Sequence, residues 1–275
     1  MLKKTDFSSL EGKVVVITGG TSGIGKSAVE LFAANGAKVV FGARREDLGN
    51  KIAADLVAQG AEVTFKRTDT SVEADVKALI DLAVEKYGRL NVLFNNAGVI
   101  PSDGMHPTHD IKVAELRRLI EINVMGYFYG VKYGAEAMLR TKSEECAIIN
   151  TASACGFRAN EGFLPYDLTK HAIVGLTKTA ALDYAKHGIT VNCICPGAIK
   201  TGIHDGISEE QLALLDAANP NGRAGRPEEC AYMVLFLASD MARMINGAPI
   251  LIDAGEWAGH VDVSGASVWS EPELK

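Results

Sequence analysis

The sequence predicts an α/β protein built on a single parallel sheet that carries helices on both faces, and two observations support this prediction. Apolar segments of strand length alternate with segments of helical periodicity along almost all of the 275 residues. The strand segments are continuous apolar runs, such as Val14 to Ile17, which are typical of strands buried on both faces. We therefore expect a doubly wound sheet of about seven strands.

In the first half of the chain, each expected strand is followed by a helix. Asn35-Gly36 and Gly60 suit helix C-termini, and Ser71 is a plausible N-cap for the third helix. The expected strands are 14–17, 38–41, 61–66 and 90–94, and the expected helices are 26–34, 47–59, 72–87 and 114–139.

The same alternation continues in the second half. The expected strands are 147–150, 190–194 and 249–252, and the expected helices are 165–186, a short one near 209–217, and 228–239. Because no linker or repeat interrupts this order, we expect one domain over residues 1–258, with a substrate loop near 199–221. The segment 259–275 lacks apolar periodicity and is expected to form a tail.

Composition excludes several classes of protein. A net charge of −6 without a long basic run argues against a nucleic-acid partner. No stretch approaches 18 consecutive apolar residues, so no membrane span is expected, and no signal peptide is recognisable, which points to the cytoplasm. The five cysteines and six histidines show no metal-ligand spacing, so no metal site is expected.

A glycine-rich turn joins the first strand to the first helix, where a dinucleotide pyrophosphate can dock. Glycine lets the chain turn tightly and lets backbone N–H groups approach the phosphates at the helix N-terminus. The strand–turn–helix context supports nucleotide binding by this segment. The residues are Gly19, Thr21, Ser22, Gly23, Ile24 and Gly25.

The end of the second strand indicates which dinucleotide is bound. An acidic residue there would bind the ribose hydroxyl of NAD, whereas arginine suits the additional phosphate of NADP. Arg44 and Arg45 occupy this place, so NADP(H) is favoured and NAD(H) remains possible. The alternative is that both arginines are merely solvated.

Residues 149–170 contain the most specific chemistry. Ser153 lies just past the end of a strand, and Tyr166 and Lys170 are four residues apart on one face of the next helix. An ammonium group beside a phenol favours the phenolate and lowers the tyrosine pKa. The pattern predicts a proton donor, although a tyrosine and a lysine at this spacing can also be an ordinary surface pair.

Together these motifs resemble those of the short-chain dehydrogenase/reductase family. The resemblance rests on Thr18 to Gly25, Asn95 to Gly98, Ser153, Tyr166 with Lys170, and Pro196-Gly197 with Thr201, and it covers residues 10–256. It implies a Rossmann-type fold and an NAD(P)-dependent oxidoreductase acting on CH–OH groups, typically a homotetramer or a homodimer. Two details depart from the common family pattern. Thr151-Ala152-Ser153 stands where two adjacent serines are frequent, and Asp167 and Leu168 stand where smaller residues usually occur.

The resemblance also implies residue roles. Tyr166 would be the general acid or base, Lys170 would lower its pKa and bind the nicotinamide ribose, Ser153 would hold the substrate oxygen, and Asn123 would complete a proton relay. Further cofactor contacts would come from Asp69, Thr70, Asn96, Ala97, Gly98, Pro196, Gly197, Ile199 and Thr201, besides Tyr166 and Lys170.

The substrate pocket would be largely apolar. Ser153 and Tyr166 would meet the reacting group, and Cys155, Phe163, Ile203 and His204 are the other candidates, although Phe163 could equally pack in the core. The expected reaction is hydride transfer between NADP(H) and a ketone or secondary alcohol. One alternative is an NAD-dependent secondary alcohol dehydrogenase of hydroxysteroid or polyol type, and another is a dinucleotide-sensing protein without turnover.

Overall fold

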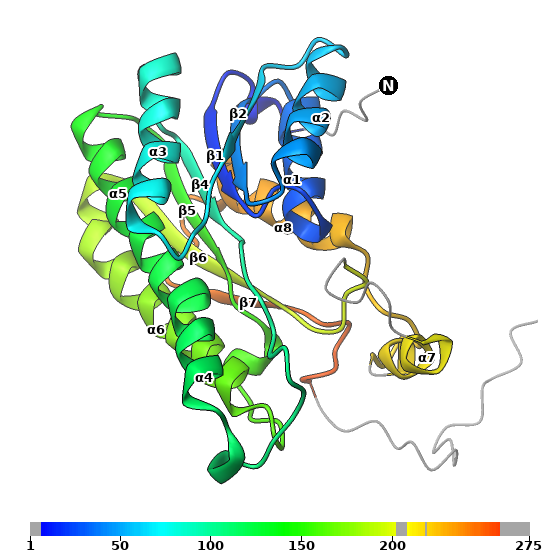
Figure 1. Cartoon of the computed structure of the whole chain (residues 1–275). Coiled ribbons are helices and arrows are strands. Elements are labelled where there is room, and N and C mark those ends of the chain that lie inside the picture. The colour runs from blue at the N-terminus through cyan, green and yellow to red at the C-terminus, as the bar shows by residue number, and fades with distance from the viewer. Residues whose placement is uncertain (1–6, 202–207, 218, 259–275) are drawn as a thin grey trace, which may run out of the picture.

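The computed structural model describes residues 7–201, 208–217 and 219–258, and they form one seven-stranded sheet between two layers of helices (Figure 1). The strand order is β3-β2-β1-β4-β5-β6-β7, and every neighbouring pair is parallel. This confirms the predicted doubly wound sheet. The strands are β1 (Val14–Thr18), β2 (Lys38–Ala43), β3 (Val63–Arg67), β4 (Val92–Asn95), β5 (Cys146–Thr151), β6 (Ile189–Pro196) and β7 (Pro249–Ile252).

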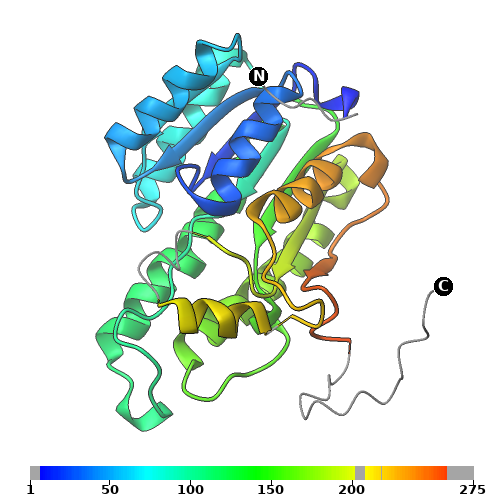
Figure 2. The same cartoon turned by 90° about the vertical axis from the view of Figure 1, so that its right-hand side faces the viewer.

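Helices cover both faces of the sheet, as the views in Figures 1 and 2 show. One layer contains α1 (Gly23–Ala34), α2 (Glu46–Val57) and α8 (Pro227–Ala238), and the other contains α3 (Glu73–Tyr87), α5 (Gly126–Arg140) and α6 (Leu164–Tyr184). Val15 and Ile17 of β1 pack with the first layer, whereas Val14 and Val16 pack with the second. Because successive side chains of a strand point to opposite faces, both cores need apolar residues, which explains the continuous apolar runs.

The predicted helix 114–139 is wrong as a single regular helix. It consists of α4 (Val113–Ile120), a π-helical segment (Glu121–Met125) and α5. The N-cap of α3 is Val72 rather than Ser71, and the Ser71 hydroxyl donates instead to Asp69 Oδ1 at 2.7 Å. The short helix α7 (Glu209–Ala217) lies apart from both helical layers (Figure 1).

Two kinds of feature are absent from the described residues. No helix among them combines the length and the apolar character needed to cross a membrane. Within the same residues, no three His, Cys, Asp or Glu side chains are grouped so that they could hold a metal ion.

Candidate active site

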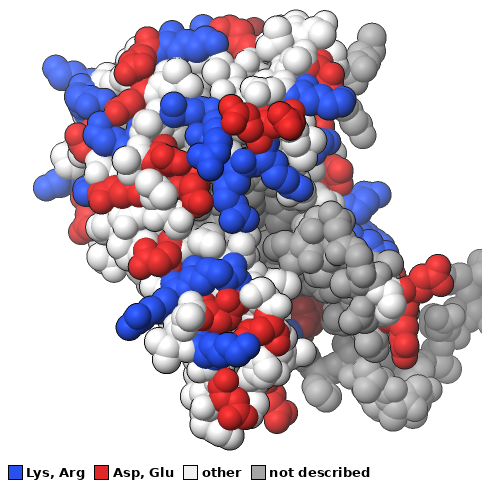
Figure 3. Space-filling model, in the orientation of Figure 1, with Lys and Arg blue, Asp and Glu red and all other residues white. Residues whose placement is uncertain are grey.

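A cavity of about 710 Å³ opens at the carboxyl edge of the sheet, and the loops after β1 to β7 contribute to its wall. Basic side chains gather in the upper middle of the face that Figure 3 shows. Most of the residues that the sequence indicated line this cavity: Gly19, Thr21, Ser22, Gly23, Ile24, Arg44, Arg45, Asp69, Thr70, Asn96, Ala97, Gly98, Ser153, Cys155, Phe163, Tyr166, Lys170, Pro196, Gly197, Ile199 and Thr201.

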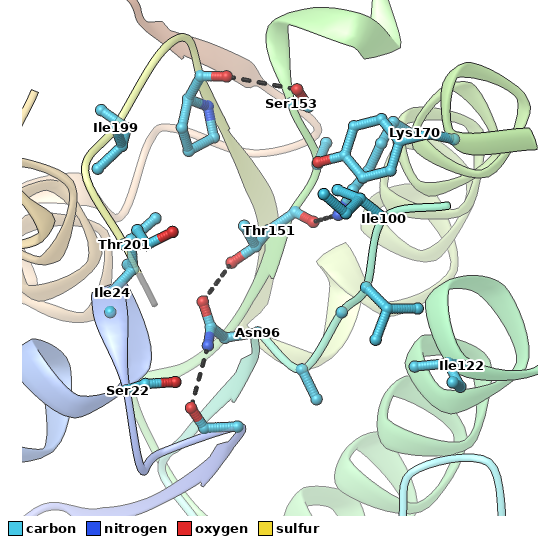
Figure 4. A pocket seen from close by; sticks show the side chains of 18 of the residues that line it. Ser22, Ile24, Asn96, Ile100, Ile122, Thr151, Ser153, Lys170, Ile199 and Thr201 are labelled. Carbon is cyan, nitrogen blue, oxygen red and sulfur yellow. Dashed lines mark hydrogen bonds between the residues drawn. The ribbon is translucent and has the colours of Figure 1, made fainter. Parts of the chain in front are cut away.

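The glycine-rich turn bends back against the strands before α1 begins at Gly23. Gly19 has a φ of +72°, and its N–H donates to Gly42 O of β2 at 2.8 Å. A side chain at Gly25 would collide with Gly19 O, so Gly25 lets the helix pack on the turn and does not itself line the cavity. Ser22 and Ile24, at the start of α1, lie beside the cavity (Figure 4).

Asn96 ties three strands together at the floor of the cavity (Figure 4). Its backbone N–H donates to Thr18 Oγ1 at 3.0 Å, and its Nδ2 donates to Thr18 O at 3.4 Å. Thr151 Oγ1, at the end of β5, donates to Asn96 Oδ1 at 3.2 Å. Thr151 therefore acts as a donor within this network.

The two arginines stand where β2 ends and differ in their surroundings. Arg45 donates from Nη2 to Thr21 Oγ1 at 3.2 Å, which connects it to the glycine-rich turn. Arg44 is exposed and lies close to Asp69. Burial raises the pKa of Asp69, but hydrogen bonds from Ser71 and the positive charge of Arg44 outweigh it, so that pKa is below its usual value. Asp69 is thus held as a carboxylate beside the cavity.

Lys170 is buried at the opposite end of the cavity. Its Nζ donates to Thr151 O at 2.9 Å and lies 5.3 Å from the ring centroid of Tyr166 and 5.5 Å from that of Tyr127 (Figure 4). Burial lowers the pKa of Lys170 to about 8, because the desolvated ammonium ion is disfavoured. The ammonium group is therefore adjacent to Tyr166 and directed at a backbone carbonyl.

Tyr166 does not have the lowered pKa that we expected from its lysine neighbour. Burial raises the pKa of the phenol above its usual value, and the nearby Cys155 thiol adds to the rise. A hydrogen bond from Ser153 opposes the rise. The surroundings of the phenol therefore raise its pKa on balance, and the predicted net lowering of this pKa is wrong.

Ser153 lies between the loop after β5 and the end of β6. Its Oγ accepts the N–H of Cys155 at 3.2 Å and donates to Pro196 O at 3.4 Å. The side chain is buried at the cavity wall, close to Tyr166. Ser153 and Tyr166 can thus approach the same substrate oxygen.

Asn123 does not line the cavity. It is fully buried in the π-helical segment, where Nδ2 donates to Val99 O at 2.8 Å and Oδ1 accepts Val99 N–H at 2.9 Å. Its amide therefore holds the loop after β4, including Gly98, against the helix. The implied place of Asn123 in a proton relay remains a prediction.

The expected substrate residues are only partly confirmed as part of the cavity wall. Phe163 stacks at 5.0 Å between ring centroids with Tyr166, and Cys155 is half-buried beside it. Ile203 and His204 lie outside the described residues. Sequence reasoning missed Ile100, Ile122 and Glu256, which also line the cavity. Ile122 directly precedes Asn123, and this adjacency was the one feature of the sequence that could have placed Ile122 near the site.

Comparisons with known proteins agree with this geometry. A family model described as enoyl-(acyl carrier protein) reductase matches residues 19–256. Cyclohexanol dehydrogenase from Acinetobacter sp. (strain SE19) is 36% identical over 252 residues, which cover 92% of this chain and 98% of that protein. A 2,5-dichloro-2,5-cyclohexadiene-1,4-diol dehydrogenase from Sphingobium indicum (strain DSM 16413) is 38% identical, with 90% and 98% covered.

A similar solved structure is that of levodione reductase. It superposes with a TM-score of 0.84 at 34% sequence identity, and the match covers 91% of this chain and 99% of that one. The similarity therefore extends over nearly the whole length of both proteins.

Proposed function

The chain belongs to the short-chain dehydrogenase/reductase family, and from this premise we propose that it transfers a hydride between NADP(H) and a ketone or secondary alcohol, with Tyr166 as general acid and base. Membership makes the protein an oxidoreductase that uses a nicotinamide dinucleotide. The observation that carries the finer proposal is the meeting of Ser153, Tyr166 and Lys170 in the cavity that also contains the glycine-rich turn.

The residues present suit such a dinucleotide. The N-terminus of α1 offers backbone N–H groups to phosphate, and Arg44 and Arg45 offer guanidinium groups farther along the wall. When bound, the nicotinamide supplies or accepts the hydride, which leaves the protein to orient the substrate and to manage one proton.

The proton moves between Tyr166 and the substrate oxygen. In reduction, the phenol donates its proton to the carbonyl oxygen as the carbonyl carbon receives the hydride, and in oxidation the phenolate takes the proton back. Ser153 donates a hydrogen bond to the same oxygen. Lys170 stabilises the phenolate through its charge, and its remaining N–H donors suit a ribose hydroxyl.

NADP(H) is the favoured cofactor because Arg44 and Arg45 follow β2 and both line the cavity. A phosphate there would meet two guanidinium groups, and bidentate charge-assisted hydrogen bonds suit it. Asp69 lies nearby as a carboxylate, which supports NAD(H) as the second candidate. A titration of the purified protein with NADPH and NADH, followed by nicotinamide fluorescence, decides between them.

Cyclic secondary alcohols and their ketones are the proposed substrate class. Two relatives are named as dehydrogenases of cyclohexanol and of a cyclohexadiene-diol, and another is a borneol dehydrogenase from Lavandula x intermedia. In this chain, Ile100, Ile122 and Phe163 supply apolar walls for such a ring. Hydroxysteroids and polyols remain alternative substrates.

Turnover of cyclohexanol with NADP⁺ or NAD⁺, and of cyclohexanone with the reduced cofactors, tests the reaction. Tyr166→Phe is expected to lower kcat by 10³-fold or more, on the order that loss of general acid–base catalysis predicts, while the Kd of the cofactor changes little. A variant that retains activity would refute the role of Tyr166. Cofactor binding without turnover of any alcohol or ketone by the unaltered protein would favour the sensor alternative.

We also propose that copies of the chain associate, as a homodimer or a homotetramer. Phe128 of α5 and Leu168 and Leu182 of α6 are exposed apolar side chains on the same helical layer. Their burial between copies would remove apolar surface from water. Light scattering coupled to size-exclusion chromatography measures the mass in solution. The cytoplasmic location remains a prediction from the sequence.

A further inference from the structure

We propose that Arg158 and Glu256 form a specificity-determining pair that hydrogen-bonds a second, uncharged oxygen of the substrate. Substrates with a further hydroxyl or carbonyl group are then favoured over those with a single oxygen. This inference rests on the proposed function, because the pair lines the same cavity as Ser153 and Tyr166.

The pair joins two segments that are far apart in the chain. Arg158 lies in the loop between β5 and α6, and Glu256 follows β7. Arg158 Nη2 donates to Glu256 Oε1 in a salt bridge. The Glu256 side chain is 14% exposed and the Arg158 side chain 33% exposed, so most of both side chains is removed from bulk water.

Contacts place the pair close to the reacting groups. Ser153 Oγ reaches Pro196 O, and a Cβ atom added to the next residue, Gly197, would meet Glu256 Oε2 at 3.0 Å. On the other side, the charge of Arg158 acts on Cys155, where it opposes the rise that burial causes in the thiol pKa. The pair thus borders the space next to Ser153.

The arginine retains hydrogen-bonding capacity. Its Nε is buried and has no hydrogen-bond partner among the described residues. A guanidinium group has five N–H donors, and the pairing with Glu256 uses one of them. We expect an oxygen of a bound substrate to accept from the terminal N–H donors that the pairing leaves over.

The charges of the two side chains offset one another, which sets the chemistry of the ligand. A carboxylate substrate would compete with Glu256, and an ammonium substrate would compete with Arg158. A hydroxyl group can accept from the guanidinium and donate to the carboxylate, and a carbonyl group can accept from the guanidinium. The pair therefore suits a neutral oxygen function.

Aromatic side chains and a turn hold the pair in position. The Arg158 guanidinium carbon lies 5.4 Å from the Trp257 ring centroid, and Trp257 also stacks with Phe157 at 6.5 Å. Asp253 accepts the N–H groups of Gly255 at 3.0 Å and of Trp257 at 2.9 Å, which orders the turn that carries Glu256. Such preorganisation reduces the entropy lost on binding.

The alternative is that the pair only fastens the two segments together. The two roles differ in their effect on substrate preference, because a fastening role would change activity equally for all substrates. The decisive quantity is therefore the ratio of kcat/KM for a diol to kcat/KM for cyclohexanol.

The experiment measures this ratio for each isomer of cyclohexane-1,2-diol and cyclohexane-1,4-diol, with the preferred cofactor. The unaltered protein should favour at least one diol by about tenfold or more, well above the factor of two that a second reactive hydroxyl gives. In the variant Arg158→Met with Glu256→Gln, which removes both charges together, this ratio should fall about tenfold or more.

A matched control is Arg223→Met with Glu229→Gln. This is another Arg–Glu pair, with Nη2 and Oε1 at 2.6 Å, and neither residue lines the cavity. The control should keep the diol preference of the unaltered protein. The melting temperatures of both variants measure how much stability is lost when each ion pair is removed.

Two results would overturn the inference. One is a diol-to-cyclohexanol ratio of two or less for the unaltered protein, and the other is a ratio that the Arg158 and Glu256 variant leaves unchanged. Failure of the proposed function is distinct, since the unaltered protein would then turn over neither cyclohexanol nor any diol.

Discussion

Lys170 of α6 donates a hydrogen bond from its buried Nζ to the backbone oxygen of Thr151 at the end of β5, at 2.9 Å. This bond connects the helix that carries Tyr166 to the centre of the sheet. The cation is nevertheless expensive to bury, and burial lowers its pKa from 10.5 to about 8. The side chain for which we propose a catalytic role thus opposes the stability of the protein without its cofactor.

Lys170→Met should therefore stabilise the cofactor-free protein by about 1–2 kcal/mol at pH 7, because the desolvation cost exceeds the lost hydrogen bond to Thr151. Between pH 8 and 10.5 the unfolded chain binds a proton at Lys170 that the folded chain does not. The free energy of unfolding of the unaltered protein therefore rises with pH over this range and is lowest below pH 8. Urea unfolding at pH 7 and 9 measures both effects. A methionine variant that is less stable at pH 7 and keeps the same pH dependence would contradict this account.

The direction of catalysis should depend on pH because burial raises the pKa of Tyr166. A protonated phenol suits reduction, so the reduction rate should hold between pH 6 and 8, whereas oxidation needs the phenolate and should increase with pH by up to about tenfold per unit. The increase should be steepest below pH 8, because above pH 8 Lys170 loses the positive charge that stabilises the phenolate. Initial rates in both directions at saturating cofactor give the profiles. An oxidation rate that is constant from pH 6 to 9 would exclude this proton route.

The arginines should separate the two cofactors. Arg44→Ala is expected to raise the Kd of NADPH by about tenfold or more and that of NADH by less than about threefold, because it removes one charged hydrogen-bond donor for the phosphate. Arg45→Ala should weaken both cofactors, since Arg45 also donates to Thr21 in the turn. Arg140→Ala on α5 serves as the control, because this half-exposed arginine does not line the cavity. Equal weakening of both cofactors by Arg44→Ala would disprove the selectivity argument.

Local sequence patterns were sufficient to predict the sheet and most of the residues that line the cavity. Val14 to Ile17 is apolar at every position because its side chains pack into two cores, and that property is visible in the sequence. The carboxyl ends of parallel strands meet at one edge, so Gly19 and Ser153 could be placed together from the sequence, and the family resemblance added Asn96.

Tertiary contacts explain what the sequence did not indicate. The π-helical segment contains no proline or glycine to mark it, and the bonds from Asn123 to Val99 hold it. Glu256 reaches the cavity by pairing with Arg158, 98 residues away, and no local pattern carries such a relationship. The pKa of Tyr166 likewise depends on how densely the folded protein surrounds it.

Gly130 of α5 should tolerate no side chain. A Cβ atom there would collide with Asn95 Oδ1, and Asn95 donates to Asn150, which donates to Thr177. Gly130→Ala should therefore destabilise the protein by about 2–4 kcal/mol, through overpacking and a disturbed buried network. Thermal unfolding measures the change.

Gly175 of α6 is the matched control for Gly130, because a Cβ atom there would meet nothing within 4 Å. Gly175→Ala should stabilise the protein by about 0.5–1 kcal/mol, since glycine is a poor helix residue. If both alanine variants had the same stability, the close approach of α5 to β4 would not explain why position 130 requires glycine.

Asp167 should act on substrate binding through the loop before α6. Its Oδ2 accepts Asn160 N–H at 2.6 Å and its Oδ1 accepts Asn160 Nδ2 at 3.1 Å, while Asn160 Nδ2 also lies 3.2 Å from Cys155 Sγ. The carboxylate is buried in the first turn of α6, where the helix dipole favours a negative charge. Asp167 thus holds the segment that carries Cys155 and Arg158.

Asp167→Asn should cost about 1–3 kcal/mol of stability, because an amide replaces a charged acceptor of two hydrogen bonds. It should raise KM for the alcohol more than it lowers kcat, and it should leave the Kd of the cofactor nearly unchanged, because the loop borders the substrate end of the cavity. Asp183→Asn, an exposed carboxylate on the same helix, controls for the loss of charge. Steady-state kinetics and cofactor titration on both variants provide the comparison. A loss of cofactor affinity as large as the rise in KM would show that Asp167 supports the whole cavity rather than its substrate end.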